Sequence, residues 1–218
     1  PRSTHCISSA ASDVYKRQGQ PASFGNLQAE YKGIDVGQFA APVLVDIDRD
    51  GKLDLVVGEM GGTLRYYHNI GTAQVADFAS SPDDNKWGFV DTQPVCCTGF
   101  AIPFIFENNA NNRYDLLVGS ESGKVMYYAD IESQIGDTFQ LTQARFGDIN
   151  EGQRTAIAGA DLNNDGTWDW IVGNVRGGVG FYSGNGPVIT SVNPADAHSF
   201  DWEVFPNPSN GNIAVTVS

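Results

Sequence analysis

One pattern occurs three times along this 218-residue chain and constrains its fold more than any other feature. It consists of a hydrophobic run, a nine-residue polar loop, a second hydrophobic run that ends in Gly, and an aromatic pair. The three copies align without gaps at 41–67, 102–128 and 156–182. The spacing is 61 residues from Asp46 to Glu107 and 54 residues from Glu107 to Asp161. Self-similarity at such a period indicates a repeat architecture, in which each unit buries an apolar face against the next.

The residues within each copy are typical of short antiparallel strands. The runs are rich in Val, Ile, Tyr, Phe and Trp, and the segments that join them hold Gly, Asn and Asp. We expect one strand near Phe24, Phe78 or Phe139 at the start of each unit. Three more strands follow in each unit, at 41–46, 54–57 and 63–67, at 102–107, 115–118 and 124–128, and at 156–161, 169–172 and 178–182. Paired glycines such as Gly58 and Gly62 predict hairpin turns with positive φ.

Four antiparallel strands per unit of this length are typical of a β-propeller blade. We therefore predict an all-β chain of three four-stranded antiparallel blades over residues 19–183, with units at about 19–75, 76–135 and 136–183. Because propellers typically need four to eight blades, we expect these three to belong to a larger propeller. A polar linker is predicted at 184–199. Residues 1–18 show no clear period and resemble translated adapter sequence, so we expect them to contribute nothing to the fold.

The polar loops of the first and third copies carry oxygen ligands at matching positions. The first loop offers the carboxylates of Asp46, Asp48, Asp50 and Asp54 and the backbone carbonyl of Lys52. The third loop offers, in the same order, Asp161, Asn163, Asp165, Asp169 and the backbone carbonyl of Thr167. An all-oxygen cage with a Gly at its sixth position is typical of Ca²⁺, since Mg²⁺ demands stricter octahedral geometry and Zn²⁺ favours His or Cys, which the loops lack. An EF-hand would need Glu at the twelfth position, where this chain has Val57 and Val172. The spacing therefore predicts two calcium sites.

The middle loop is a weaker version of the same pattern. Its candidate ligands are Glu107, Asn109, Asn111 and Asp115, of which only the first and last are charged. Asn112 stands where the other loops have Gly and can adopt the left-handed conformation. Because calcium affinity follows the number of charged ligands, we expect weak binding or none at this third position.

The metal loops, the hydrophobic strand before each, and the LDLVVG, LLVG or IVG run after each resemble the FG-GAP/VCBS family of calcium-binding β-propeller repeats, including the integrin α-chain type. The resemblance covers about residues 24–183. It implies a propeller fold and calcium ligands at the loop positions named above.

The C-terminal residues 200–218 resemble the start of the C-terminal sorting domain of the type IX secretion system. The resemblance lies in the FPNP sequence at 205–208, followed by a polar turn and a strand-like run at 213–217. It implies that the type IX secretion machinery is a partner through this end, and that the protein is secreted or held on the surface of a Gram-negative bacterium. Calcium loops with dissociation constants of about 10⁻⁴ to 10⁻³ M would be filled outside the cell. An ordinary Pro-rich turn with an edge hairpin is the alternative interpretation.

Charge and residue types disfavour several functions. The chain has 26 acidic and 13 basic residues, a formal charge of −13, which disfavours nucleic acid and anionic membranes as partners. No apolar run approaches the roughly 20 residues of a membrane helix, so we expect no membrane insertion. None of the histidines, His5, His68 and His198, has a partner at a spacing typical of a catalytic triad or a metal site. The adjacent Cys96 and Cys97 could form a vicinal disulfide or remain two thiols.

The leading hypothesis is a secreted, calcium-stabilised β-propeller that serves as a binding or adhesion module at the cell surface. Its ligand would be a protein or a polysaccharide, and this segment would not be catalytic. The alternative is a fragment of a secreted enzyme, a polysaccharide lyase or hydrolase, whose catalytic residues lie in other blades or in an upstream domain.

Overall fold

The computed structural model of the chain describes residues 31–184, apart from 94–97, 109 and 164. The chain divides into two units, Pro1–Tyr31 and Lys32–Ser218, and all the sheets belong to the second. Several predictions lie outside the described residues. They are the predictions for residues 1–18, for the strand near Phe24, for Asn109, for Cys96 and Cys97, for the linker beyond residue 184, and for residues 200–218.

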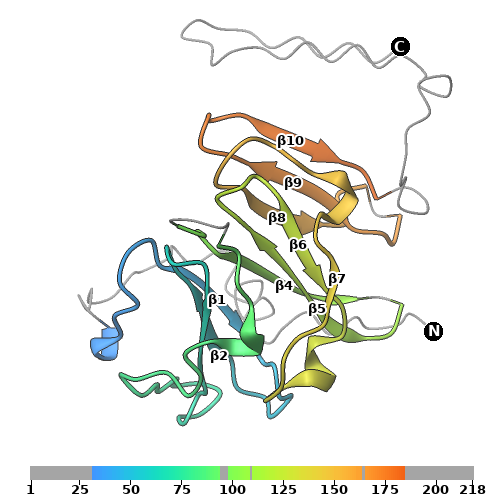
Figure 1. Cartoon of the computed structure of the whole chain (residues 1–218). Coiled ribbons are helices and arrows are strands. Elements are labelled where there is room, and N and C mark those ends of the chain that lie inside the picture. The colour runs from blue at the N-terminus through green and yellow to red at the C-terminus, as the bar shows by residue number, and fades with distance from the viewer. Residues whose placement is uncertain (1–30, 94–97, 109, 164, 185–218) are drawn as a thin grey trace, which may run out of the picture. The chain divides into compact units, whose positions relative to one another are not determined.

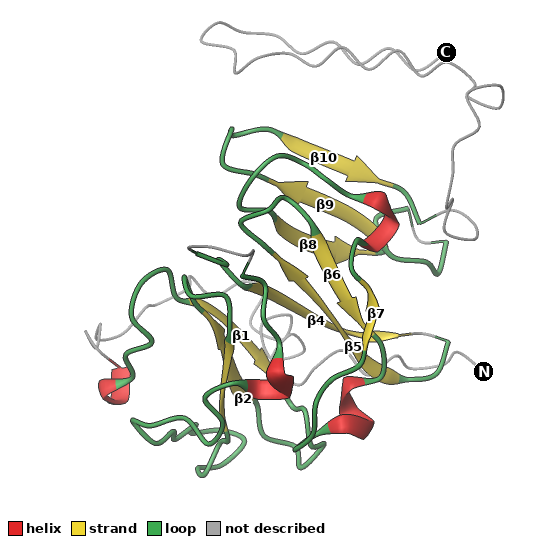
Figure 2. Cartoon of the chain, viewed as in Figure 1, coloured by secondary structure: helices red, strands yellow, loops and turns green. Residues whose placement is uncertain are grey.

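The described residues form an all-β fold, as predicted (Figures 1 and 2). The ten strands are β1 (Ala41–Val45), β2 (Asp54–Gly58), β3 (Leu64–Tyr67), β4 (Ile102–Asn108), β5 (Arg113–Gly119), β6 (Val125–Tyr128), β7 (Leu141–Gln143), β8 (Ala156–Ala160), β9 (Asp169–Gly173) and β10 (Val179–Tyr182). The helical segments of the described residues are four short 3₁₀ turns, namely η1 (Tyr31–Gly33), η2 (Trp87–Phe89), η3 (Ile131–Gln134) and η4 (Phe146–Asp148).

The strands form three antiparallel sheets in which each strand pairs with its neighbour along the chain. The first sheet is β1-β2-β3, the second is β4-β5-β6-β7 and the third is β8-β9-β10. The register repeats as well: the strand residues Leu55, Leu116 and Trp170 each pair with the second member of an aromatic pair. The gapless alignment of the sequence copies is therefore also an alignment of hydrogen-bonded positions.

The predicted first strands of the second and third units are wrong in their position. The strand expected near Phe139 lies at Leu141–Gln143, and it pairs with β6, so it completes the second sheet and does not open the third. Phe78 lies in no strand, and at the corresponding edge of the first sheet there is only an isolated bridge between Tyr66 and Asp84. In the described residues, therefore, only the second sheet has four strands. Phe78 and Phe139 are core residues outside the strands, with 6% and 3% of their surface exposed. Burial, and not a place in a strand, explains the apolar residue at these two positions.

Strand β5 of the second sheet is buried on both faces. Leu116 and Val118 lie in one cluster with Val56 of the first sheet, whereas Leu117 lies in another cluster with Val172 of the third sheet. Because successive side chains of a strand point to opposite faces, this alternation places the first and third sheets against opposite faces of the second.

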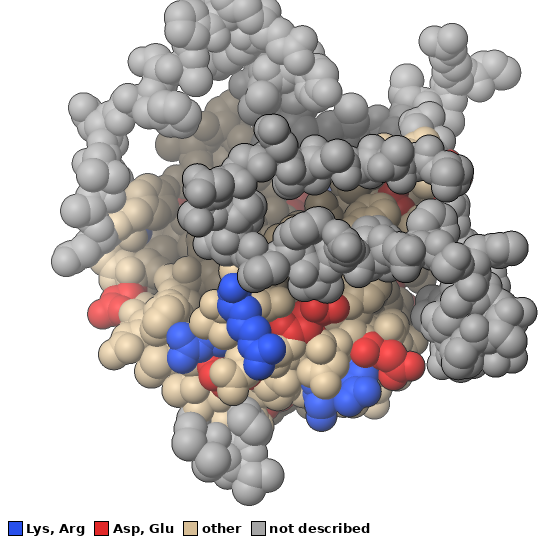
Figure 3. Space-filling model, turned by 90° about the horizontal axis from the view of Figure 1, so that it is seen from above, with Lys and Arg blue, Asp and Glu red and all other residues tan. Residues whose placement is uncertain are grey.

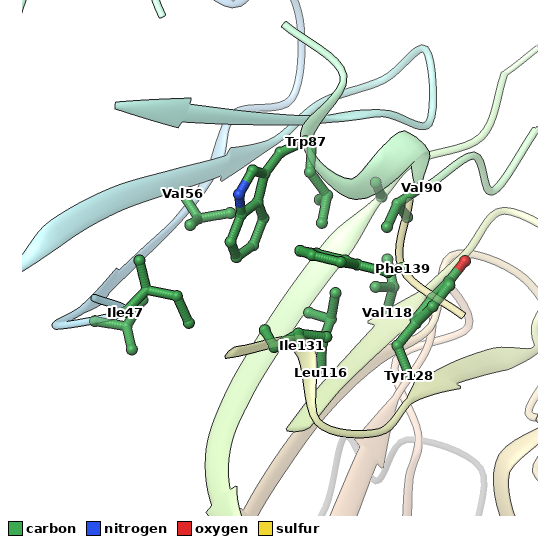
Figure 4. Packing of buried hydrophobic residues seen from close by; sticks show 12 residues of the cluster. Ile47, Val56, Trp87, Val90, Leu116, Val118, Tyr128, Ile131 and Phe139 are labelled. Atoms are coloured by element: carbon green, nitrogen blue, oxygen red, sulfur yellow. The ribbon is translucent and has the colours of Figure 1, made fainter. Parts of the chain in front are cut away.

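Trp87 of η2 fills the space between the first two sheets (Figure 4). Its ring stacks on Tyr66 with centroids 5.5 Å apart and meets the Phe139 ring nearly edge-on at 4.8 Å. Only 2% of Trp87 is exposed. Full burial of a large apolar side chain contributes about 1.5–3 kcal/mol, so Trp87 stabilises the packing of the first sheet against the second.

Two of the repeated glycines permit close contact between successive repeats. Gly62 has a φ of 99°, as the hairpin prediction requires, but Gly58 and Gly119 do not have positive φ. Instead, a Cβ at Gly58 would overlap the carbonyl oxygen of Ala101, and a Cβ at Gly119 would overlap the carbonyl oxygen of Thr155. These positions are glycine because the backbone of the next repeat passes directly over them.

Replacement of Gly119 by alanine should therefore destabilise the protein, by about 1–3 kcal/mol, because the added methyl group overlaps the Thr155 backbone. Gly173→Ala is the matched control, since no described atom lies within 4 Å of the Cβ it would add at the equivalent end of β9. It should change the free energy of unfolding by less than about 0.5 kcal/mol. Chemical denaturation measures both, and equal effects of the two variants would contradict the close approach.

Candidate metal centre

The first polar loop joins β1 to β2 and curls through hydrogen bonds from its own backbone to its carboxylates. Asp46 Oδ2 accepts the N–H of Gly51 at 3.0 Å. Asp48 Oδ1 accepts the N–H of Asp50 at 3.1 Å, and Asp50 Oδ1 accepts the N–H of Lys52 at 2.9 Å. Gly51 has a φ of 86°, which a residue with a side chain rarely adopts. The loop is therefore wrapped around its acidic side chains.

This curl brings the carboxylates together. Oxygens of Asp46, Asp48 and Asp50 lie within 4.8 Å of one another, and so do ligand atoms of Asp48, Asp54 and His68. Asp46 Oδ1 is buried and has no hydrogen-bond partner among the described residues. An unsatisfied buried acceptor costs about 1–3 kcal/mol, and more when it is charged, so a cation at this point would be stabilising. The first loop thus has the convergent hard oxygens that Ca²⁺ prefers.

Lys52 places a cation of the chain itself beside this cluster. Its Nζ lies 2.7 Å from Asp50 Oδ2 and donates to the backbone carbonyl of Asn69 at 3.2 Å. The hydrogen bond from Lys52 lowers the pKa of Asp50. Asp50 is therefore held as a carboxylate, with Oδ1 on the backbone N–H of Lys52 and Oδ2 on its ammonium group. The role of the Lys52 carbonyl as a ligand stays a prediction.

The ninth residue of each loop, here called the anchor aspartate, is buried and has a structural role. The anchor aspartates are Asp54, Asp115 and Asp169, each with at most 1% of its surface exposed. Oδ1 of each accepts the backbone N–H of a residue just beyond the following hairpin, at 2.8–2.9 Å, from Asn69, Asp130 and Gly184 respectively. The anchor aspartate therefore ties the polar loop to the end of the next hairpin in all three repeats.

The first aromatic residue of the pair adds a second bond to two of these anchors. Tyr66 donates its hydroxyl to Asp54 Oδ2 at 3.0 Å, and Tyr127 donates to Asp115 Oδ2 at 2.6 Å. The third repeat has Phe181 at this position, and Asp169 Oδ2 accepts the N–H of Leu162 instead. Burial raises the pKa of Asp54. The sequence predicted the anchor aspartates only as metal ligands. The structure shows that they connect the loops to the hairpins through these hydrogen bonds.

The third loop has the same turn but more open carboxylates. Asp161 Oδ2 accepts the N–H of Gly166 at 3.0 Å, and Asp165 Oδ1 accepts the N–H of Thr167 at 2.8 Å. The Asn163 amide donates to Asp165 Oδ2 at 2.8 Å. Among the residues that the structure describes, both clusters of three or more Asp, Glu, His or Cys side chains include Asp48 of the first loop. The structure thus brings the carboxylates of the first loop together more closely than those of the third.

In the middle loop, the two charged residues are engaged by the protein. Asp115 accepts a hydrogen bond from the Asn108 side-chain amide at 2.7 Å, in addition to the hydrogen bonds given above for the anchor aspartates. Glu107 forms an ion pair with Arg49 at 3.0 Å. Asn111 Oδ1 accepts the N–H of Arg113. Asn112 has a φ of 53°, which confirms that it takes the place of the loop Gly.

Arg49 links the first loop to the second sheet. It lies between the predicted ligands Asp48 and Asp50, yet its guanidinium reaches Glu132 through Nε at 2.8 Å and Nη2 at 3.0 Å. Nη2 also donates to the carbonyl of Asn112 at 2.7 Å. The Arg49 hydrogen bonds lower the pKa of Glu132, whose side chain is only 13% exposed. A positive charge from one loop thus neutralises acids around the next.

His68 is the residue that sequence reasoning missed. It follows β3 directly, and its Nδ1 lies 3.2 Å from Asp54 Oδ1 and 3.7 Å from Asp48 Oδ2. The expectation that no histidine has a partner at a metal-site spacing overlooked this contact, because the contact runs across the β2–β3 hairpin. Its sequence signal is a histidine that follows an aromatic pair in the repeat with the most acidic loop.

Acidic and basic side chains lie next to one another over the described surface. Lys32, Arg49, Lys52 and Arg154 each have a carboxylate oxygen within 3.0 Å. On the face in Figure 3, blue and red surfaces accordingly adjoin. Such pairing neutralises the positive charge on which binding of polyanions depends.

Comparison of the chain with protein-family models, with curated proteins and with solved structures found no match. Within the part of the chain that the structure describes, none of the helices has the length and apolar character needed to cross a membrane.

Loss of the Arg49 side chain should weaken the contact between the first loop and the second sheet. Arg49→Ala should lower the free energy of unfolding by about 1–2 kcal/mol at pH 7, because it removes a two-point pair with a largely buried carboxylate. Arg113→Ala, whose side chain is 48% exposed and lies 3.7 Å from Glu132, should cost less than about 0.5 kcal/mol.

This loss should depend on pH in one direction. The pKa of Glu132 is lowered from 4.5, so the contribution of Arg49 is fully present above that pH and is lost as the pH falls through the lowered value. Urea unfolding of both variants at pH 7 and pH 3 measures the difference. An Arg49→Ala effect that is equal at both pH values, or matched by Arg113→Ala, would refute this account of the pair.

Proposed function

We propose that this chain is part of a secreted, calcium-stabilised β-propeller that acts as a non-catalytic binding or adhesion module at the bacterial cell surface. The observation that carries the calcium part of the proposal is the convergence of the Asp46, Asp48 and Asp50 carboxylates in the first loop, where Asp46 Oδ1 is buried with no hydrogen-bond partner among the described residues. These are hard oxygen donors on a loop that ties two strands together, which suits a structural Ca²⁺.

Asp46, Asp48, Asp50 and Asp54 would hold the ion, together with the carbonyl of Lys52. Calcium supplies the positive charge that balances these carboxylates when it is bound. Asp54 also bonds the end of the β2–β3 hairpin, so an occupied site would connect the β1–β2 loop to that hairpin. An ion that binds only the folded state stabilises it by about 2.7 kcal/mol at a hundredfold excess over its dissociation constant.

The third loop supplies the second site, with Asp161, Asn163, Asp165 and Asp169 and the carbonyl of Thr167. The side chains of Asp161 and Asp165 are exposed, and binding would have to draw them together, so we expect this site to be the weaker one. The middle loop would bind weakly or not at all, because Arg49 already supplies positive charge beside Glu107.

The packing of the sheets supports the propeller part of the proposal. Val56 of the first sheet and Leu117 of the second are fully buried against the sheet that follows each of them. The equivalent residue of the third sheet, Ile171, is 41% exposed, and its neighbours Val179 and Phe181 are 76% and 48% exposed. The third sheet thus presents the apolar face that the other two bury, as expected if a further sheet of the same kind packs there.

The binding role and the secretion rest on the sequence. The FG-GAP/VCBS resemblance supports a ligand-binding propeller with a protein or polysaccharide ligand, and the FPNP segment at 205–208 supports export through the type IX machinery. Calcium outside the cell is abundant enough to fill sites with dissociation constants of about 10⁻⁴ to 10⁻³ M. A net charge of −13 agrees with a chain that needs divalent cations to balance its acids.

Calcium should raise the melting temperature of the protein. At about a hundredfold excess over the dissociation constant we expect an increase of about 5–10 °C relative to chelator, since 1 kcal/mol corresponds to about 2–4 °C in a chain of this size. Asp46→Ala and Asp165→Ala should each remove part of the increase. Asp137→Ala removes the same charge at an exposed position outside the loops and should leave the increase intact. A midpoint that calcium does not move would refute the calcium proposal.

A further inference from the structure

His68 brings a nitrogen donor to the oxygen cluster of the first loop. Its backbone N–H donates to Asp83 Oδ2 at 2.7 Å, which fixes the residue at the end of β3. Its Nδ1 lies 3.2 Å from Asp54 Oδ1, 3.7 Å from Asp48 Oδ2 and 3.4 Å from the Tyr66 hydroxyl. The side chain is 34% exposed, so the imidazole lies between the cluster and solvent.

Nitrogen beside carboxylates changes which cations a site prefers. Ca²⁺ takes oxygen ligands almost exclusively, whereas imidazole suits the later divalent first-row metals such as Co²⁺ and Ni²⁺, which also accept carboxylates. Asp48 belongs to both ligand clusters, the all-carboxylate one with Asp46 and Asp50 and the mixed one with Asp54 and His68. The two clusters therefore overlap at one loop and offer an ion either set of donors.

The chain contains its own comparison for this feature. Residues that directly follow the aromatic pair are His68, Ala129 and Ser183 in the three repeats. Only the first repeat thus has a nitrogen donor at this position, and it is the repeat whose carboxylates converge. The third loop shares the turn and the anchor aspartate but has oxygen donors alone.

We infer that His68 is a ligand that makes the first loop a site for a later divalent first-row transition metal, such as Co²⁺ or Ni²⁺, as well as for Ca²⁺. The third loop takes Ca²⁺ without this second preference. The inference rests on the proposed function, because it requires that the first loop binds a divalent cation.

Calorimetric titration of the full chain with Co²⁺, Ni²⁺ or Ca²⁺ alone tests the inference. His68→Asn should weaken Co²⁺ and Ni²⁺ binding at least about tenfold, and should change Ca²⁺ binding less than about threefold. His198→Asn removes another imidazole and should leave all three affinities unchanged. Ser183→His places an imidazole after the third aromatic pair and should strengthen Ni²⁺ binding there, which keeps the test valid if His68→Asn unfolds.

Proton NMR gives an independent readout. Substoichiometric Ni²⁺, which is paramagnetic, should broaden or shift the imidazole C–H signals of His68, identified by their loss in His68→Asn, before those of the other histidines. Unchanged Co²⁺ and Ni²⁺ affinities in a folded His68→Asn variant, or no selective broadening, would overturn the inference. If Ca²⁺ still binds the wild type and one of its sites is lost in Asp46→Asn, the proposed function stands while the inference fails. If no cation binds the wild type, both fail.

Discussion

Electrostatic crowding in one short loop is the constraint on which this account depends. Carboxylate oxygens of Asp46, Asp48 and Asp50 lie within 4.8 Å of one another, so their like charges repel, and Lys52 balances only the charge of Asp50. The strands impose this arrangement: Ile47 is fully buried, and Asp54 is held by the hairpin that follows it. A divalent cation is the natural way to make such a loop favourable.

The three repeats balance the charge of this shared loop in different ways. All keep the anchor aspartate, because it accepts the backbone N–H that ends the next hairpin, whatever else the loop does. The first loop concentrates acids and has His68 beside them. The middle loop has fewer acids, and Arg49 from the preceding loop pairs with Glu107 and Glu132. The third loop leaves Asp161 and Asp165 exposed to solvent.

The sequence predicted what local patterns determine. Runs of β-branched and aromatic residues at the repeat spacing identified three strands of each sheet, and the Gly or Asn at the sixth loop position identified the turns. It could not identify β7, since Leu141–Gln143 has one apolar residue in three and its pairing with β6 follows from tertiary position. Nor could it distinguish Phe139 in a strand from Phe139 packed against Trp87, because both need an apolar residue.

The contacts of Arg49 and His68 escaped prediction for a related reason. Arg49 reaches acids of another sheet, and His68 contacts Asp54 across a hairpin, so neither contact has a fixed spacing in the chain.

Equilibrium dialysis with radioactive calcium tests directly whether the first and third loops bind Ca²⁺, because it counts the ions bound to each chain. We expect two Ca²⁺ per wild-type chain and one in either Asp46→Asn or Asp165→Asn. A wild-type chain that binds no calcium at millimolar concentration, or variants that bind as many ions as the wild type, would contradict this expectation.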